Sequence, residues 1–209
     1  MHPNRDLWQA TYEARDQEEL VEAYSRWAED YDKDTVETMG YVAPLHAAKA
    51  LDARLGSKQA RILDAGAGTG LVGEMLNQAG YHNIDALDIS REMLDIAATK
   101  QVYQNLIQAD MSQTLDVDDN AYDAVVCVGT FTYGHVRAEA FNELVRITNP
   151  EGFICFTVRE GAYEAYDYRK HMVRLEAQEV WELLEMTRED YLVKEKVQSL
   201  LCSYKVLEC

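Results

Sequence analysis

The stretch Arg61–Gly70, RILDAGAGTG, decides the fold, because a short apolar segment is followed by an acid and then by a glycine at every second position. Glycine costs roughly 0.5–1 kcal/mol relative to alanine inside regular structure, so three glycines this close together mark a tight turn or a ligand at contact distance. The residues ARILDAG predict a buried strand, and LVGEMLNQAG predicts a helix ended by Gly80. The glycines therefore lie between a strand and a helix, where α/β folds bind ligands.

The same alternation of strand and helix continues toward the carboxyl terminus. Further strands are expected at 83–90, 106–111, 122–130 and 152–160, and helices at 91–99 and 138–147. Five strands with intervening helices predict a parallel, doubly wound α/β sheet. Two helices precede it, at 16–32 and 44–55, and a helix at 162–180 follows it.

Two more strands complete the expected sheet. Residues 199–209 are typical of a strand, whereas 181–192 fit helix or strand on propensity alone and are assigned as strand. We therefore expect a seven-stranded, mostly parallel, Rossmann-like sheet with an N-terminal helical lid. No repeat, low-complexity tract or linker divides the chain, so one domain is expected over 1–209, with a helical cap at 1–57 and a ligand-binding core at 58–209.

Charge and composition narrow the classes of partner. Thirty-seven acidic residues against 20 basic ones give a net charge of −17, which repels phosphate backbones and anionic membrane surfaces. The apolar runs fall far below the roughly 18 residues that span a bilayer, and the N-terminus lacks a signal-peptide core, so a cytoplasmic location is expected. The four cysteines show no paired spacing and predict free thiols, and the five histidines lack the spacing of metal ligands.

The glycine pattern and two acids together indicate a nucleoside site. Residues 66–70 read GxGxG, which is neither the dinucleotide GxGxxG nor the phosphate-binding GxxxxGK[ST], so nicotinamide and nucleoside-triphosphate cofactors are disfavoured. Asp88 ends the second expected strand, where a carboxylate can bind both hydroxyls of a ribose. Asp110 and Met111 end the third, and offer an acceptor for an adenine amino group and an apolar face for its ring.

With these residues in place, the sequence resembles the class I S-adenosylmethionine-dependent methyltransferases from about Tyr24 onward. The four family motifs correspond to Asp64–Gly70, Asp88–Leu94, Ala109–Met111 and Tyr122–Cys127. Within that class, Tyr31–Asp32, Gly129–Val136 and Phe156–Arg159 resemble the methyltransferase-like proteins of the Williams–Beuren critical region. One departure is Pro150-Glu151-Gly152, where such proteins usually carry two glycines after the proline.

The resemblance implies S-adenosylmethionine as the cofactor and S-adenosylhomocysteine as its product. It implies that the glycines pass the methionine portion, that Asp64 orders the loop or meets the amino group, that Asp88 holds the ribose, and that Asp110 meets the adenine. An apolar sandwich around the ring would come from Ile89, Met93 and Met111. The full set of expected cofactor contacts is Tyr24, Trp27, Tyr31, Asp64, Gly66, Ala67, Gly68, Gly70, Asp88, Ile89, Met93, Asp110, Met111 and Gly129.

Three aromatic residues of the first helix have two readings. Tyr24, Trp27 and Tyr31 fall at i, i+3 and i+7, on one helical face. Such stripes usually pack in a core. Similar proteins use the segment before the first strand to close over the cofactor, so a lid remains an equal alternative.

Methyl transfer from a sulfonium is an in-line displacement with an activated leaving group, so holding the nucleophile in place is the main task. Residues 129–135 are expected to form the floor of the acceptor pocket. His135 could act as a general base, or it could cap a helix or bond to backbone, which the resemblance favours. Arg159 could hold a substrate carboxylate or form a surface ion pair. The expected substrate contacts are Phe131, Tyr133, Arg159 and Tyr163.

The leading functional hypothesis is methyl transfer to an oxygen, nitrogen or sulfur nucleophile of a small molecule, by a monomer or weak homodimer. Residues 129–135 lack the Asn/Asp-Pro-Pro-aromatic arrangement associated with methylation of base or amide nitrogens, which again disfavours nucleic acid. Two alternatives stay open. One is a protein or peptide methyltransferase drawn to basic partners by the charge of −17. The other is a module that binds the cofactor or its product without catalysis.

Overall fold

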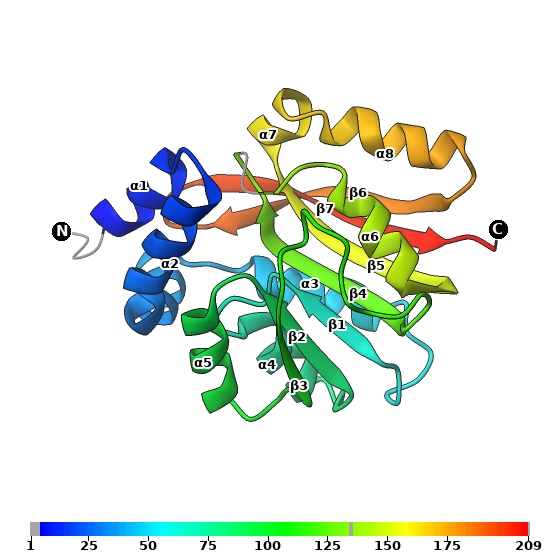
Figure 1. The fold of residues 1–209 in the computed structure, drawn as a ribbon, viewed down its shortest axis with the longest axis horizontal. Coiled ribbons are helices and arrows are strands. Elements are labelled where there is room, and N and C mark those ends of the chain that lie inside the picture. The colour runs from blue at the N-terminus through cyan, green and yellow to red at the C-terminus, as the bar shows by residue number, and fades with distance from the viewer. Residues whose placement is uncertain (1–4, 134–135, 209) are drawn as a thin grey trace.

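A twisted sheet with helices on both faces forms the centre of the molecule (Figure 1). The computed structural model describes residues 5–133 and 136–208. In that part of the chain the sheet has seven strands in the order β3-β2-β1-β4-β5-β7-β6. Their bounds are β1 Ile62–Ala65, β2 Ile84–Asp88, β3 Asn105–Gln108, β4 Tyr122–Phe131, β5 Thr148–Arg159, β6 Trp181–Leu192 and β7 Val197–Val206.

The pairing confirms the mostly parallel sheet expected from sequence. Strands β3, β2, β1, β4 and β5 pair in parallel, whereas β7 runs antiparallel to β5 and β6 antiparallel to β7. The strand assigned to 181–192 is confirmed as β6. Parallel strands bring their carboxyl ends to one edge, so the ends of β1, β2 and β4 face the same region.

The helices agree with expectation in the core and differ at two places. Those described are α1 Arg5–Glu13, α2 Gln17–Asp32, the π-helix η1 Lys33–Met39, α3 Ala43–Asp52, α4 Leu71–Gln78, α5 Arg91–Thr99, α6 Ala140–Ile147, α7 Glu160–Ala165 and α8 Tyr168–Ala177. Helix α1 and η1 were not expected. The single helix expected at 162–180 is two helices, because Asp167 has a left-handed backbone (φ 58°) that ends one helix before the next begins.

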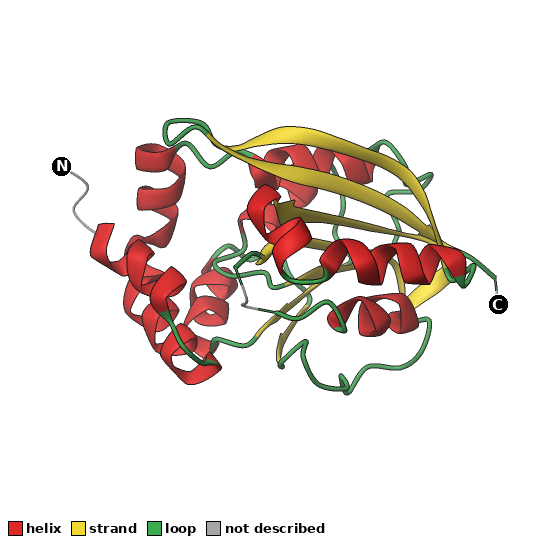
Figure 2. Cartoon of the chain, turned by 90° about the horizontal axis from the view of Figure 1, so that it is seen from above, coloured by secondary structure: helices red, strands yellow, loops and turns green. Residues whose placement is uncertain are grey.

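Helices lie on both sides of the sheet (Figure 2), and a hydrophobic core lies on each of its faces. One contains residues of α6 and α8 with an aromatic group in which Phe156, Trp181 and Tyr204 stack. The other contains residues of α3 and α4, including Leu51 and Leu76. Since both faces are covered, the central strands are buried on both sides, as their continuous apolar sequences predicted.

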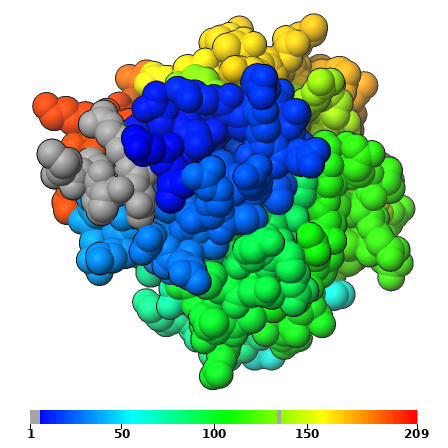
Figure 3. All heavy atoms as spheres, turned by 60° about the vertical axis from the view of Figure 1, so that its left-hand side comes forward, coloured from blue at the N-terminus to red at the C-terminus, as the bar shows by residue number. Residues whose placement is uncertain are grey.

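The N-terminal helices cover the end of the molecule at which the parallel strands terminate (Figures 1 and 3). Helix α2 lies beside α5, where the Ser25 hydroxyl donates to Glu92 Oε2 at 2.8 Å. The Trp27 indole is buried and donates to Asp34 Oδ2 of η1 at 2.9 Å. We call α2 and η1 the lid.

Two further expectations concern the cysteines and the segment Pro150–Gly152, which was expected to form a turn before the fifth strand. Cys127, Cys155 and Cys202 are buried free thiols, as predicted, and burial raises the pKa of Cys127 to about 12; Cys209 lies outside the described residues. Glu151 lies within β5 and not in a turn before it. It adopts a left-handed backbone (φ 68°) where the register shifts between the pairs Tyr122–Thr148 and Ala124–Phe153. Within the described residues, no helix has the length and apolarity to cross a membrane, and no group of three or more His, Cys, Asp or Glu could hold a metal.

Candidate active site

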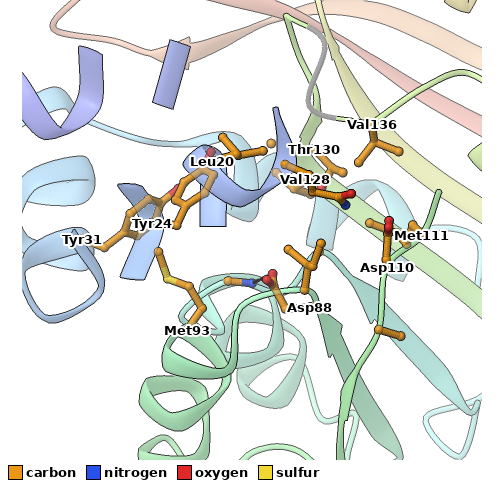
Figure 4. Close-up of a pocket in the computed structure, with 16 residues that line it drawn as sticks. Leu20, Tyr24, Tyr31, Asp88, Met93, Asp110, Met111, Val128, Thr130 and Val136 are labelled. Carbon is orange, nitrogen blue, oxygen red and sulfur yellow. Dashed lines mark hydrogen bonds between the residues drawn. The ribbon is translucent and has the colours of Figure 1, made fainter. Parts of the chain in front are cut away.

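A cavity of about 730 Å³ lies at the carboxyl ends of β1, β2 and β4, under the lid (Figure 4). We call it the cofactor cavity. Ten of the expected cofactor contacts line it: Tyr24, Tyr31, Gly66, Gly68, Asp88, Ile89, Met93, Asp110, Met111 and Gly129. Six lining residues were not among the expected cofactor contacts, although Thr130 belongs to the segment expected to form the floor of the acceptor pocket: Gln17, Leu20, Ala109, Val128, Thr130 and Val136. Val128 and Thr130 flank Gly129 at the end of β4, a position that could have identified them.

The glycine loop is fitted to β4 on one side and open on the other. A Cβ on Gly66 would lie 2.2 Å from Thr130 Oγ1, so this glycine lets the loop pack against the strand. A Cβ on Gly68 would meet no atom within 4 Å, so it would project into open space. Both residues have positive φ, at 74° and 54°, which only glycine adopts without strain. The loop therefore offers bare backbone to a ligand.

Asp88 connects the glycine loop to the end of β2. Its Oδ2 accepts from the Gly68 N–H at 2.8 Å, and its Oδ1 accepts from the Ser90 N–H at 2.9 Å. Burial raises the pKa of the carboxyl, while these N–H donors oppose the rise. A carboxylate has about four lone-pair positions, so acceptor capacity remains for the hydroxyls of a bound ligand.

Apolar side chains and a second acid complete the cofactor cavity. Figure 4 shows Asp110 and Met111 on the side of the cavity opposite Tyr24 and Tyr31. The two oxygens of Asp110 accept from the N–H and the hydroxyl of Ser112, at 2.7 and 2.8 Å, which fixes the carboxylate in place. The cavity thus combines two carboxylates with apolar and aromatic side chains, which fits a nucleoside.

Four expected cofactor contacts do not line the cofactor cavity. Asp64 is fully buried and accepts from the Tyr103 hydroxyl at 2.6 Å; burial raises its pKa to about 7. Ala67 donates its N–H to the Leu87 carbonyl, and Gly70 begins α4 with φ 89°. Asp64, Ala67 and Gly70 thus contact the protein itself and hold the conformation of the glycine turn. Trp27 is 2% exposed and lines a second cavity instead.

That second cavity, of about 410 Å³, adjoins the first and shares Tyr24, Tyr31 and Gly129 with it. We call it the tyrosine chamber. Its other walls come from α1, η1, the segment after η1, β4 and β6, and include Tyr12, Tyr41 and Tyr191. Tyr41 and Tyr191 have ring centroids 4.9 Å apart, and a Cβ on Gly129 would lie 2.9 and 3.0 Å from their hydroxyl oxygens. Burial raises the pKa of Tyr191 to about 12, so this phenol is neutral at physiological pH.

The residues expected to contact substrate lie in different places. Phe131 packs in the core against Phe141, with ring centroids 4.4 Å apart, and Tyr163 packs against the same core, so neither lines the two cavities. Phe131 packs on the same core as Val125 and Cys127, because the register of β4 shifts between Cys127 and Phe131 and interrupts the simple alternation from Gly129. His135 lies outside the described residues.

Two of the expected substrate residues do lie beside the tyrosine chamber. Tyr133 is exposed, and its ring centroid is 5.9 Å from that of Tyr12. Arg159 is buried at the end of β5, and its Nη1 donates to the Tyr12 hydroxyl at 3.3 Å. No sequence signal pointed to Tyr12, Tyr41 and Tyr191 as a group, because they come from segments far apart in the chain.

Comparison with known proteins identifies a family. The family model described as "Methyltransferase domain" matches residues 63–156. Human Methyltransferase-like protein 27 is 36% identical over 166 residues, covering 76% of this chain and 66% of that protein. A malonyl-acyl-carrier-protein O-methyltransferase of Pseudescherichia vulneris is 28% identical over 169 residues, covering 77% of this chain and 64% of that protein. The chain thus spans slightly less than two thirds of the length of these relatives.

Solved structures agree on the fold. The 4+2 cyclase SpnF superposes with a TM-score of 0.74 at 13% identity, covering 94% of this chain and 98% of that one. A putative S-adenosyl-L-methionine-dependent methyltransferase of Methanococcus maripaludis gives 0.65 at 19% identity, with 88% and 94% covered. At such identities the likeness shows the fold alone. With the family model, the relatives and the glycine-loop cavity in agreement, the chain belongs to the class I S-adenosylmethionine-dependent methyltransferases and resembles the Williams–Beuren critical-region type within them.

Proposed function

We propose that this chain transfers the methyl group of S-adenosylmethionine to an oxygen, nitrogen or sulfur nucleophile of a small molecule. One observation carries the proposal: the cofactor cavity and the tyrosine chamber share a wall at Tyr24, Tyr31 and Gly129. Group transfer between two molecules requires two adjoining sites that hold the reacting atoms close and aligned.

The chain's own residues would hold the cofactor as follows. Asp88 accepts hydrogen bonds from the ribose hydroxyls, and Gly66 and Gly68 let the backbone approach the amino-acid portion. Asp110 lies where an adenine amino group can be received, with Met93 as an apolar contact for the ring. The cofactor supplies a methyl group that its positive sulfur already activates for displacement.

Closure of the lid would exclude water from the reacting atoms. Asp32, at the end of α2, accepts from the hydroxyl of Thr69 in the glycine loop, and its Oδ2 lies 2.7 Å from Lys100 Nζ. The lid is thereby fastened to the loop that binds the cofactor. His135 remains the predicted candidate for a general base.

A small acceptor is favoured over a macromolecule by enclosure and charge. The tyrosine chamber is covered by α1 and the lid, and the chain carries a net charge of −17. An 18S rRNA (guanine-N7) methyltransferase of Arabidopsis thaliana is similar, with 39% identity over 67 residues, but that match covers only 32% of this chain. Nucleic-acid affinity draws mainly on lysine and arginine, which are the minority here. We place this activity in the cytoplasm, in a monomer or weak homodimer of one domain.

Calorimetry and thermal unfolding with S-adenosylhomocysteine test the cofactor site. A ligand at a hundredfold excess over its dissociation constant should stabilise the chain by about 2.7 kcal/mol. Absence of both heat and stabilisation contradicts the proposal.

Methyl-labelled S-adenosylmethionine then tests the acceptor. We would offer a metabolite extract, bulk protein and RNA separately, and expect label in the metabolite fraction. Label chiefly in protein would favour the peptide alternative, and label in RNA would overturn the electrostatic argument. Tight cofactor binding without transfer to any fraction would leave the non-catalytic binding module.

A further inference from the structure

A buried arginine at the edge of the tyrosine chamber has no acidic partner. Arg159 is only 9% exposed, yet among residues 5–133 and 136–208 it forms no ion pair. Its neighbour in sequence, Glu160, pairs with Arg188 instead. Burial of an unpaired charge is costly, so a protein keeps one where a partner arrives from outside.

The contacts that Arg159 does make leave most of its donors unused. Its Nη1 donates to the Tyr12 hydroxyl at 3.3 Å, and the guanidinium carbon lies 5.0 Å from the ring centroid of Tyr191 and 5.6 Å from that of Tyr133. These rings stabilise a cation without accepting its in-plane hydrogens. A guanidinium has five N–H donors, so the planar edge remains available to an acceptor with two oxygens.

A second polar group without a partner lies beside it. Ser199 of β7 is directly opposite Arg159 of β5 in the antiparallel register, so the two side chains face the same side of the sheet. Ser199 is 1% exposed, and its Oγ has no hydrogen-bond partner in the described part of the chain. A buried guanidinium whose only acceptor among the described residues is the Tyr12 hydroxyl thus lies beside a buried hydroxyl with no partner, and this pair of groups is suited to bind an anion.

This face of β5 leads to the tyrosine chamber. Thr157, two residues before Arg159 and on the same face, accepts from the Gly129 N–H through its Oγ1 at 3.0 Å. Gly129 forms part of the wall shared by both cavities, and the Tyr12 and Tyr191 rings that contact Arg159 line the chamber. An anion on Arg159 would therefore hold a molecule whose body lies among the tyrosines.

From this geometry, and building on the proposed function, we infer that the methyl acceptor is a small acid whose single carboxylate binds Arg159 and Ser199 and whose apolar or aromatic body occupies the tyrosine chamber. A carboxylate fits better than a phosphate dianion because one guanidinium balances one negative charge and can bond both oxygens of a carboxylate.

The test compares an acid with its neutral amide on the chain saturated with S-adenosylhomocysteine. The probes are 3-phenylpropanoate and 3-phenylpropanamide, which share their body and differ in charge. Calorimetry should show the acid binding about tenfold or more tighter than the amide, as expected when a hydrogen-bonded charge pair is gained. Equal affinities, or no binding of either probe at millimolar concentration, would overturn the inference.

Variants test whether the preference for the acid over the amide depends on Arg159 or on the charge of the surface in general. Arg159→Gln should abolish the preference for the acid, and Arg159→Lys should retain part of it. Arg188→Gln, which removes a nearby exposed arginine that pairs with Glu160, is the matched control and should keep the full preference. A preference that survives in Arg159→Gln contradicts the inference.

The affinity for S-adenosylhomocysteine, measured in the same samples, keeps the two proposals apart. It should be the same in wild type and all three variants, which also establishes that each variant folds. If wild type fails to bind S-adenosylhomocysteine, the proposed function fails, and the comparison of acid with amide is made on the chain alone, where the same acid preference is expected.

Discussion

The two cavities that share Gly129 are built in opposite ways. The cofactor cavity takes its bare backbone and its two carboxylates from the glycine loop and the residues at or just after the ends of β2 and β3, within residues 66–111. The tyrosine chamber takes its walls from α1, the lid, residue 41, β4 and β6, between residues 8 and 192. A site made of consecutive strand ends can be predicted from the order of elements in the sequence. A site made of distant segments forms only after the sheet has folded.

Their chemistry differs as well. Bare backbone and carboxylates face the cofactor cavity, and burial raises the pKa of Asp88 there. Neutral phenols face the chamber, with Arg159 as its nearby charge. The cofactor cavity therefore suits a polar nucleoside of fixed structure. The tyrosine chamber suits an acceptor that is recognised by its charge and its apolar body. The predictions below ask whether the two regions can be altered separately.

The largest expected effect is the loss of cofactor binding in Gly68→Val. The side chain would enter open space at the glycine loop, on a backbone with φ 54° that a β-branched residue does not adopt without strain. Affinity for S-adenosylhomocysteine should fall more than about a hundredfold by calorimetry, which exceeds 2.7 kcal/mol. Gly56→Val is the control, since this glycine also has open space around it but lies outside both cavities. Normal binding in Gly68→Val would remove the loop from the site.

Asp88→Ala should have the second largest effect on the same titration. It removes the acceptor for the Gly68 N–H together with the proposed partner of the ribose, so binding should weaken by about 1.5–3 kcal/mol. Asp95→Ala, on the surface of α5 where Asp95 pairs with Arg91, should leave the affinity unchanged. Equal affinities of the two variants would show that Asp88 only shapes the loop.

A smaller effect is expected for Asp32→Asn, which weakens the contact between the lid and the glycine loop. Loss of the ion pair with Lys100 should reduce affinity for S-adenosylhomocysteine by about 0.5–1.5 kcal/mol. Hydrogen exchange should show that added ligand protects residues 20–40 in wild type and protects them less in the variant. Glu29→Gln, an exposed change on α2, serves as the control. If ligand leaves exchange in 20–40 unchanged in wild type, the aromatic stripe is ordinary core.

The smallest effect on cofactor binding is expected for Tyr191→Phe. Its hydroxyl lies in the tyrosine chamber, and Tyr191 does not line the cofactor cavity, so affinity for S-adenosylhomocysteine should change by less than about 0.5 kcal/mol. Binding of 3-phenylpropanoate should change more than that. A larger change in cofactor affinity than in acid affinity would mean that the two cavities act as one site.

Much of the fold was predictable because its signals are local. The segments before and after the glycines give β1 and α4, and the helix expected at 91–99 is α5 with the same bounds. Even the ambiguous 181–192 was assigned correctly as β6. Helix α1 was missed, and α7 and α8 were merged, because no glycine or proline marks the break at Asp167.

The sequence by itself determined the parallel sheet, the glycine turn and the acids that line the cofactor cavity, since each follows from the order of strands and from residues next to their ends. Only the tertiary structure decided what lies beside them. It buries Asp64, Ala67 and Gly70 within the turn, turns Phe131 into the core and brings Tyr12 onto Arg159. Burial and the direction of a side chain depend on neighbours that can be far away in the chain, 39 residues for Asp64 and Tyr103 and 147 for Tyr12 and Arg159. The tyrosine chamber therefore forms only when those neighbours pack together.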